Sequence, residues 1–220
     1  MELRKAINER KSIRGFKSDP VPKHILQEVL QLASRSPSSV NSQPWEFAVI
    51  TGEVLDNIRK DNIDCYRNDQ PFDLPDVAIE GIYRDRRVTL AKQLFISMDI
   101  AREDRERRSW WEQRGYRFFD APAVIILYMD QSLDEATFRF DLGCVAQSIC
   151  LAAMEYGLGT CVEDQAIMYQ RGLYKYLDLP PDKRLVTGIA IGYPDWEFPA
   201  NHVHSTREEV DSVTRWYGFE

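Results

Sequence analysis

Hydrophobic residues recur at helical spacing in several segments of the chain, and short apolar runs lie between these segments. The pattern predicts a short helix at residues 2–10 and a second helix from Ile25 onward, with Pro22 before it in a position suited to a first helical turn. A third helical stretch follows Gly52 and continues to Arg59. In the second helix the apolar positions are three and four residues apart, at Leu26, Val29, Leu30 and Ala33.

Two longer helices are predicted in the middle of the chain. Residues 83–108 read as one long amphipathic helix, whose mixed-sign segment Arg102–Arg108 is typical of a solvated outer face. Residues 140–156 carry apolar or small side chains on nearly every side, so we expect this helix to be buried all round. In a domain of this size, part of that burial is expected to come from a second subunit.

Short apolar runs predict strands at residues 47–50, 123–128, 160–162 and 185–191. They alternate irregularly with the helices, without repeated βαβ units, which indicates an α+β or mixed α/β fold. The length suits a single domain over residues 1–220.

Two segments do not fit this pattern. Residues 62–82 lack periodicity and contain Pro71 and Pro75, so they indicate a functional lid or insertion, which with the helix after it spans about 62–118. Residues 195–220 are polar with scattered large aromatics, and this C-terminal extension is expected to wrap around a partner subunit.

Composition excludes several classes of function. The chain has 220 residues, 44% of them hydrophobic, and a net charge of −7, which argues against a nucleic-acid partner. No apolar run is long enough to span a membrane, and the first residues lack the apolar segment of a signal peptide, so a cytoplasmic protein is expected. The four cysteines form no Cys-x-x-Cys pair, and with three histidines and no ligand pattern we predict no metal site.

Common catalytic motifs are also missing. The chain has no Gly-x-Gly-x-x-Gly opening a helix, no phosphate-binding loop of the Walker type and no Gly-x-Ser-x-Gly elbow. The chemistry is therefore expected to come from a bound cofactor rather than from side chains.

The loop Ser36–Trp45 is unusually rich in hydrogen-bonding side chains. Serines, an asparagine and a glutamine are interleaved with two prolines that stiffen the backbone. A rigid loop of this kind, between a helix and a strand, indicates a binding site; an ordinary polar turn is the alternative.

A second polar cluster, Arg10, Lys11, Ser12 and Arg14, offers cationic and hydroxyl donors for a phosphate. The same residues could instead be the favourable cations of a helix C-terminus. A third segment, the turn Gly157–Thr160, is expected to expose backbone N–H groups against which a flat ring could lie.

Together these segments resemble the FMN-dependent nitroreductase family, in the family's order and from end to end of the chain. The matching pieces are Arg10-Lys-Ser-Ile-Arg14-Gly-Phe16, Pro20-Val-Pro22, Ser36-Pro-Ser-Ser-Val-Asn-Ser-Gln-Pro-Trp45-Glu-Phe47, Asp120-Ala-Pro122, Asp141-Leu-Gly-Cys-Val-Ala-Gln147, Gly157-Leu-Gly-Thr-Cys161 and Gly188-Ile-Ala-Ile-Gly-Tyr-Pro194. The resemblance implies a nitroreductase-like α+β fold with a central, mostly antiparallel sheet flanked by helices. It also implies an intertwined homodimer with one FMN at each subunit interface.

The resemblance further implies which residues hold FMN. Arg10, Lys11, Ser12 and Arg14 would hold the phosphate, the ribityl chain and the pyrimidine edge of FMN. Arg207, near the C-terminus, would help to hold the phosphate. The lysine that family members often have shortly before this arginine is missing here, where Ser205 and Thr206 precede Arg207. The other subunit would contribute Pro37, Ser38, Ser39 and Asn41. Gly159 and Thr160 would lie beside flavin N5, and Gln147 is a further candidate.

The implied activity is ping-pong transfer of a hydride from NAD(P)H through FMN to a nitroaromatic or related small acceptor. The candidate substrate-binding residues are Tyr83, Arg84 and Arg87, in a Tyr/Arg-rich segment similar to that of nitrobenzoate-reducing members, together with Trp110 and Trp111. Surface arginines on a helix are the alternative for the first three, and dimer packing is the alternative for the tryptophans.

Other functions on the same scaffold remain open at this point. The acceptor could be a flavin or quinone, the reaction could be a reductive dehalogenation or a dehydrogenation, or the protein could bind flavin without turnover. Iodotyrosine deiodination ranks low because Glu80 and Tyr83 are three residues apart instead of four and the expected later lysine is missing.

Overall fold

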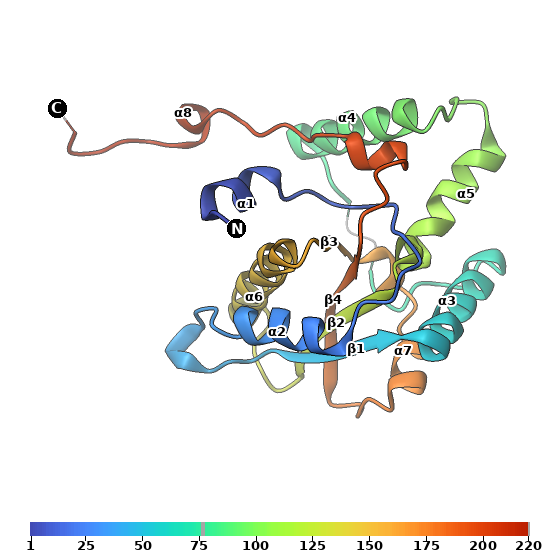
Figure 1. The fold of residues 1–220 in the computed structure, drawn as a ribbon, viewed down its shortest axis with the longest axis horizontal. Helices are drawn as coiled ribbons and strands as arrows, with labels where there is room; N and C mark the ends of the chain where they lie inside the picture. Colours follow the sequence, from blue (N-terminus) through green and yellow to red (C-terminus); the bar gives the residue numbers. More distant parts are fainter. Residues whose placement is uncertain (76–77, 220) are drawn as a thin grey trace.

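The computed structural model describes residues 1–75 and 78–219 and is built around one four-stranded antiparallel sheet with the strand order β1-β2-β4-β3 (Figure 1). The strands are β1 (Glu46–Thr51), β2 (Ala123–Asp130), β3 (Gly159–Glu163) and β4 (Lys183–Gly192). Each of the four matches a predicted apolar run. The predicted α+β fold with an antiparallel sheet is therefore confirmed.

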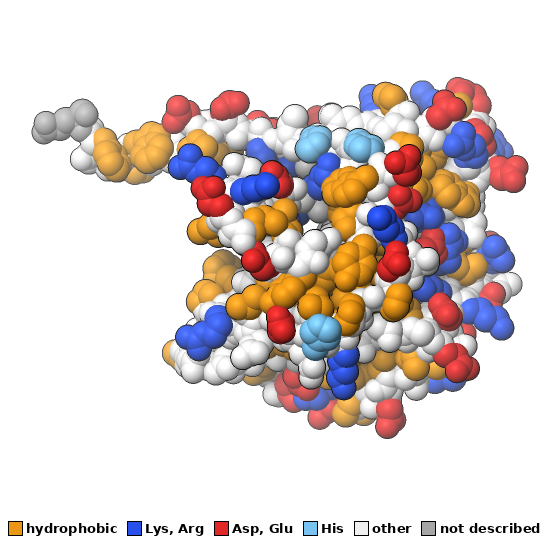
Figure 2. All heavy atoms as spheres, in the orientation of Figure 1, with side chains coloured by type: hydrophobic (Ala, Val, Ile, Leu, Met, Phe, Trp, Pro, Cys, Tyr) orange, Lys and Arg blue, Asp and Glu red, His pale blue; other side chains and the backbone are white. Residues whose placement is uncertain are grey.

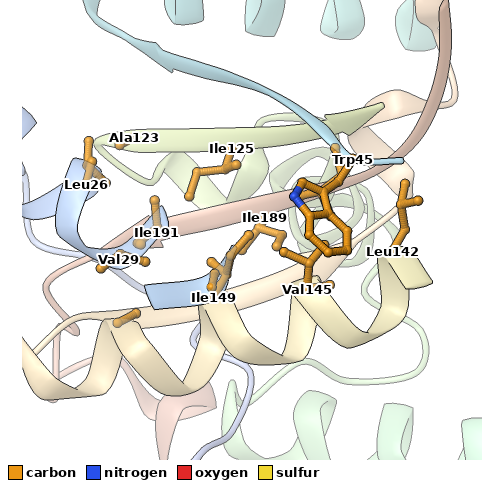
Figure 3. Close-up of a cluster of buried hydrophobic side chains, with 14 of the residues drawn as sticks. Leu26, Val29, Trp45, Ala123, Ile125, Leu142, Val145, Ile149, Ile189 and Ile191 are labelled. Carbon is orange, nitrogen blue, oxygen red and sulfur yellow. The ribbon is translucent and has the colours of Figure 1, made fainter. Parts of the chain in front are cut away.

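Both faces of the sheet are buried, which explains why the central strands read as continuous apolar runs. On one face, Ile125 of β2 packs with residues of α2 (Lys23–Ala33) and α6 (Glu135–Glu155), and Figure 3 shows this cluster. On the other face, Ile126 packs with α3 (Gly52–Arg67) and α7 (Gln170–Leu177).

The predicted helix at residues 83–108 is wrong, because the segment forms two helices, α4 (Gly81–Ser97) and α5 (Arg105–Tyr116). The chain turns between them at Asp99, which has a positive φ of 50°. The Arg107 guanidinium donates to the carbonyls of Met98 and Asp99, at 2.8 and 2.7 Å, and so binds carbonyls left free at the end of α4. At this break between α4 and α5, the Met98 side chain is buried in a small hydrophobic cluster with Leu94 and Ile100.

Two other boundaries differ from the sequence analysis. Helix α3 continues to Arg67, so the segment 62–82, predicted to lack regular structure, begins and ends helical. Helix α7 was not predicted at all, although Leu173 and Leu177 have helical spacing. Helix α1 (Leu3–Glu9) agrees with its prediction.

Helix α6 is not buried all round in this chain. The face toward the sheet is buried, but Phe140, Gly143 and Gln147 on the opposite face are exposed, Phe140 by 75%. An added Cβ on Gly143 would have no atom within 4 Å. The helix thus leaves an apolar and small-residue face open, as expected of a surface that a second subunit would cover.

After the short helix η4 (Pro199–His202) the chain runs along α4, where Glu208 pairs with Arg86, and then extends away from the body of the protein, as Figure 1 shows. The C-terminal residues form an arm that contains the single-turn α8 (Val210–Val213) and carries three exposed aromatics, Trp216, Tyr217 and Phe219. In Figure 2 the arm stands apart from the rest of the surface, with hydrophobic side chains near its tip.

Candidate functional site

A polar cavity of about 490 Å³ lies between the end of α1 and the chain that follows η4. Its lining includes four predicted cofactor residues, Arg10, Lys11, Gln147 and Arg207. These positions are far apart in sequence, so the fold brings them together. The remaining lining residues are Ile7, Asn8, Glu9, His204 and Ser205.

The cationic side chains suit a phosphate. Lys11 Nζ lies 3.3 Å from His204 Nε2 and 5.3 Å from the ring centre of Trp196, and burial lowers the pKa of Lys11 from its usual value. The Arg207 guanidinium donates to the Ser205 hydroxyl at 2.9 Å. Three cations against the single carboxylate of Glu9 give this cavity the charge that a phosphate monoester requires.

The segment after Arg10 is fixed to the edge of the sheet. Ser12 forms a parallel bridge with Thr160 of β3, and the Ile13 amide donates to the Thr160 carbonyl at 2.9 Å. An added Cβ on Gly159 would lie 2.4 Å from Ile13 Cγ1, so only glycine permits this close approach. Ser12, Gly159 and Thr160 therefore meet at one place, next to the cavity.

The exposed turn predicted at Gly157–Thr160 is partly wrong. Gly157 is exposed, but Gly159 and Thr160 belong to β3 and are buried. They line a small cavity of about 60 Å³ together with Arg10 and Lys11. Strand pairing with β4 and the Ile13 contact account for this burial.

Asn201 holds the next residues of this segment and was missed by the sequence analysis. The fully buried Asn201 side chain accepts from the amides of Arg14 and Gly15, at 2.7 and 3.2 Å, and donates to the carbonyls of Gly15 and Asp195, each at 2.7 Å. It joins two segments nearly two hundred residues apart in the chain. A single asparagine in a polar tail gives no sequence signal for such a role.

The loop predicted to bind cofactor, Ser36–Trp45, does not line either cavity described above. The Ser39 amide donates to the Asp141 carboxylate at 3.0 Å, which attaches the loop to the first turns of α6. Asp141 and Gln147 are about 9 Å apart along the helix, at 1.5 Å per residue. Within one chain, the loop residues Pro37, Ser38, Ser39 and Asn41 are thus not brought together with Arg10.

The loop is nevertheless held in a defined shape. The Ser38 hydroxyl accepts from the Gln43 amide at 3.0 Å, and Val40, Asn41 and Gln43 all have positive φ values. Val40 is 94% exposed, which is unusual for a branched apolar residue in a strained conformation. A strained, rigid and exposed loop is consistent with a surface that meets a partner or ligand.

A larger cavity of about 990 Å³ lies against α4 and α5. Among the predicted substrate residues, Arg87 and Trp111 line it, and so does Arg14. Tyr83, Arg84 and Trp110 are not part of its lining. Tyr83 is 67% exposed, and Trp110 lies instead under the guanidinium of Arg114, at 5.4 Å.

The aromatic wall of the larger cavity is ordered by packing and by cations. Trp111 lies nearly parallel to Phe198, with 10° between the ring planes, and Phe119 lies below Arg14, whose guanidinium carbon is 5.9 Å from the ring centre. Arg114 contacts the Phe198 ring at 4.6 Å and donates to the Arg14 carbonyl at 2.9 Å. Phe198 and Arg114 are not part of the cavity lining, but their contacts support three residues that are: Trp111, Phe119 and Arg14.

The arginines of the segment Arg102–Arg108 are exposed, apart from the half-buried Arg108, as expected of a solvated face. Arg105 and Arg108 line the larger cavity.

A buried carboxyl group lies at the end of β3. Oε2 of Glu163 accepts from the Ala166 amide, whereas its Oε1 is shielded from solvent and has no hydrogen-bond partner among the described residues. Burial raises the pKa of Glu163 well above its usual value.

Within residues 1–75 and 78–219, no group of three or more potential metal-ligating side chains is found. None of the helices described has the length and apolar character needed to cross a bilayer.

Comparison with known proteins gives the family. The Nitroreductase family model matches residues 7–193. Chloronitrobenzene nitroreductase of Comamonas testosteroni is 32% identical, covering 94% of this chain and 93% of that protein, and nitrobenzene nitroreductase of Ectopseudomonas oleovorans is 34% identical with the same coverage. The chain therefore belongs to the nitroreductase family.

Solved structures agree with this assignment. The FMN and NADPH-dependent nitroreductase NfnB from Sphigopyxis sp. strain HMH superposes with a TM-score of 0.92 at 31% identity, covering all of both chains. The predicted family and nitroreductase-like fold are confirmed.

Proposed function

We propose that this protein is an FMN-dependent NAD(P)H oxidoreductase that reduces nitroaromatic or related small acceptors by ping-pong two-electron transfer. The single observation that carries the proposal is the 490 Å³ cavity, which gathers Arg10, Lys11, Gln147 and Arg207. The donor set and its positive charge fit the phosphate of FMN. The relatives above are nitroreductases, and one solved neighbour is described as dependent on FMN and NADPH.

Bound FMN supplies hydride chemistry between NAD(P)H and the acceptor. In this account Arg10, Lys11 and Arg207 bind the phosphate, while Ser12 and Arg14 contact the remainder of the cofactor. Gly159 and Thr160 form the strand edge beside the flavin ring. The larger cavity, with Trp111 and Arg87, receives the acceptor.

We also infer that the working protein is a homodimer in which each FMN contacts both chains. The phosphate cavity and the Ser36–Trp45 loop are separate in one chain, although both belong to the proposed site. The open face of α6, with Phe140 and Gly143, and the aromatic arm are surfaces that a second copy would cover. The segments at about 62–118 and 195–220 would then be the substrate lid and the partner-wrapping extension.

The test is to purify the protein and measure bound FMN by absorbance and after release. We expect a yellow protein whose flavin is bleached by NADH or NADPH and is reoxidised by nitrobenzene. Arg10→Ala should lower FMN retention after dialysis about tenfold or more, because it removes a charge-assisted phosphate contact. Arg4→Ala is the matched control, since Arg4 is on α1, the helix that ends just before Arg10, and is exposed and outside the cavity.

The other outcomes distinguish the alternatives. Protein that cannot bind FMN refutes the proposal, and bound FMN that neither nicotinamide reduces indicates a binding protein without turnover. If the reduced protein reacts with quinones, free flavin or iodotyrosine and not with nitroaromatics, the scaffold assignment stands and the acceptor is wrong. The four free cysteines of the structure suit a reducing compartment, and we propose a cytoplasmic location on that basis.

A further inference from the structure

Arg114, near the end of α5, has a nearly buried guanidinium group that joins two distant segments of the chain. One terminal nitrogen pairs with the Asp120 carboxylate at 2.8 Å. The other donates to the Arg14 carbonyl at 2.9 Å and to the Phe119 carbonyl at 3.2 Å. Only 11% of the Arg114 side chain is exposed, and burial lowers its pKa from the usual value. The contact with Arg14 spans 100 residues of sequence, so it links α5 to the segment Arg10–Arg14.

Local stability accounts for only part of this arrangement. Asp120 also pairs with Arg117 at 2.7 Å, so its carboxylate has a cation even without Arg114. The Nε atom of Arg114 is shielded from solvent and has no hydrogen-bond partner among the described residues, which costs free energy. Arg59, which is buried to a similar extent, has partners for Nε and for both terminal nitrogens. A nearly buried cation with an unsatisfied donor is a conflict typical of residues that serve function.

Arg14 is held by its backbone on both sides. Its amide donates to the Asn201 side chain at 2.7 Å, and its carbonyl accepts from Arg114. The next residue, Gly15, has no room for a Cβ, which would lie 2.2 Å from Cγ of Phe198. The Arg14 side chain lines the larger cavity. Two hydrogen bonds on opposite sides of this residue, one to the buried asparagine and one to α5, thus determine where its guanidinium enters the cavity.

Arg114 lies outside the linings of both the phosphate cavity and the larger cavity. It shares a face of α5 with Trp111, which is three residues earlier and lines the larger cavity. Both side chains contact the Phe198 ring: Trp111 lies nearly parallel to it, and the Arg114 guanidinium is 4.6 Å from its centre. One turn of α5 therefore carries an aromatic residue of the larger cavity and the residue that anchors Arg14.

We propose that Arg114 is a positioning residue for the cofactor site: it holds the Arg14 carbonyl and thereby places the Arg14 guanidinium for its contact with FMN. The inference rests on the proposed function, in which Arg14 binds FMN. A cation fixed beside a flavin stabilises the negative charge that reduction adds, so its position sets the preference of the site for reduced over oxidised FMN. Arg114 acts on this preference through Arg14 and touches neither FMN nor the acceptor.

The test measures this preference without turnover. The midpoint potential of FMN bound to the protein, compared with that of free FMN, gives the ratio of the affinities for reduced and oxidised FMN. We expect Arg114→Met to weaken the binding of reduced relative to oxidised FMN about fivefold or more, which corresponds to a two-electron potential lower by about 20 mV. Arg14→Gln should have at least as large an effect, because it removes the cation itself.

A double-mutant cycle shows whether Arg114 acts through Arg14. In the Arg14→Gln background, Arg114→Met should change the ratio of affinities by less than about twofold, since the cation that it positions is already absent. An undiminished effect in that background would mean that the charge of Arg114 acts on the flavin directly, and it would overturn the proposal. An unchanged potential in Arg114→Met or in Arg14→Gln would overturn it as well.

Two control variants separate positioning from stability. Arg117→Met removes the other cation of Asp120 and leaves the contact with Arg14 in place. Arg59→Met removes a guanidinium that has 16% of its side chain exposed and that also binds two backbone carbonyls. Arg59→Met should lower the free energy of unfolding at least as much as Arg114→Met, and neither control should change the ratio of affinities more than twofold. A control that changes the ratio as much as Arg114→Met contradicts the proposal.

Arg114→Lys replaces Arg114→Met if the latter does not fold. Its ammonium group keeps the ion pair with Asp120 but lacks the planar fork that binds the Arg14 carbonyl at the same time, so the ratio should change in the same direction, by twofold or more. FMN content is measured on the same preparations. Wild-type protein without FMN refutes the proposed function, whereas FMN-loaded protein whose potential does not depend on Arg114 refutes this inference alone.

Discussion

The two cavities are built in different ways. The 490 Å³ cavity belongs to segments joined to the sheet: Ser12 pairs with Thr160, and the neighbouring backbone is held by the buried Asn201. The 990 Å³ cavity is formed largely by two helices at the periphery, α4 and α5, which meet the rest of the protein through aromatic and cation–π contacts and through hydrogen bonds at the end of α5, such as that from the buried Asn62 amide to the Tyr116 carbonyl at 3.0 Å. A cofactor site attached to the core can be shared across a family, whereas a wall of peripheral helices can change with the substrate.

Among the substitutions that test this difference between the two cavities, Asn201→Ala is expected to change the stability of the protein most. The substitution leaves two amides and two carbonyls without their partner in a buried place. We expect the free energy of unfolding to fall by about 3 kcal/mol or more, measured by urea denaturation. Asn68→Ala, which removes one exposed local hydrogen bond, should change it by less than about 0.5 kcal/mol. Similar effects of the two substitutions would show that the core-anchored cavity is no more firmly held than the surface.

A pair of glycine substitutions gives the next largest effect. Gly159→Ala places a Cβ 2.4 Å from Ile13 and should destabilise the protein by about 1–3 kcal/mol, with loss of FMN, because the strand edge must shift. Gly143→Ala meets open space on α6 within one chain and should stabilise the isolated helix by up to about 1 kcal/mol, whereas a loss of FMN in this variant would indicate that a second copy packs closely on this face. Thermal unfolding and FMN content of both variants test the claim; a harmless Gly159→Ala would contradict it.

The pH dependence of stability tests the buried carboxyl group of Glu163 at the end of β3. Because its pKa is raised in the folded state, Glu163 stays protonated on folding while the unfolded chain ionises above its ordinary pKa. The folded state then binds more protons, so stability falls as pH rises above about 4.5, by at most about 1.4 kcal/mol per pH unit. Glu163→Gln removes this loss: we expect equal stability near pH 4 and a more stable variant at pH 8, measured by urea denaturation. A variant that is less stable at pH 8 would show that the ionised carboxylate is required.

The smallest effect is expected from Arg105→Gln in the larger cavity. Removing a cation from the start of α5 should leave the free energy of unfolding unchanged or raise it by a few tenths of a kcal/mol. Arg107→Gln removes the contacts with the Met98 and Asp99 carbonyls and should lower it by about 1 kcal/mol. Chemical denaturation of both variants decides the matter, and a clear loss of stability in R105Q would mean that this arginine is structural.

Sequence reasoning predicted the elements around the sheet better than the peripheral segment that contains α4 and α5. The strands and the helices α2 and α6 were found because their apolar patterns reflect burial against the sheet, whereas the predicted α1 buries only Ala6. The break at Asp99 was not found, since alternating charges give no sign of a turn that depends on Arg107 reaching back to α4. Asn201 could not be found either, because its role arises from segments that meet only in the folded chain.

The candidate site shows the same division. The cluster Arg10–Arg14 and the turn at Gly159 were recognised by resemblance, and the structure places them next to each other. The arginines Arg105 and Arg108 were interpreted as surface charges, and Arg105 is exposed; that both also line the larger cavity depends on the geometry of α5 and has no signal in the sequence. That the loop around Ser39 completes the cofactor site of a second chain stays a prediction.

The central claim is that each FMN site uses the phosphate cavity of one chain and the Ser36–Trp45 loop of another. Two differently tagged chains test it most directly, one carrying R10A and the other carrying Ser39→Trp, a bulky block at an exposed loop position. Each homodimer should hold little FMN, because both of its sites contain the defect. The doubly tagged heterodimer has one site with both defects and one with none, so the account predicts about one FMN per two chains. Heterodimers that hold no more FMN than the two homodimers would contradict it.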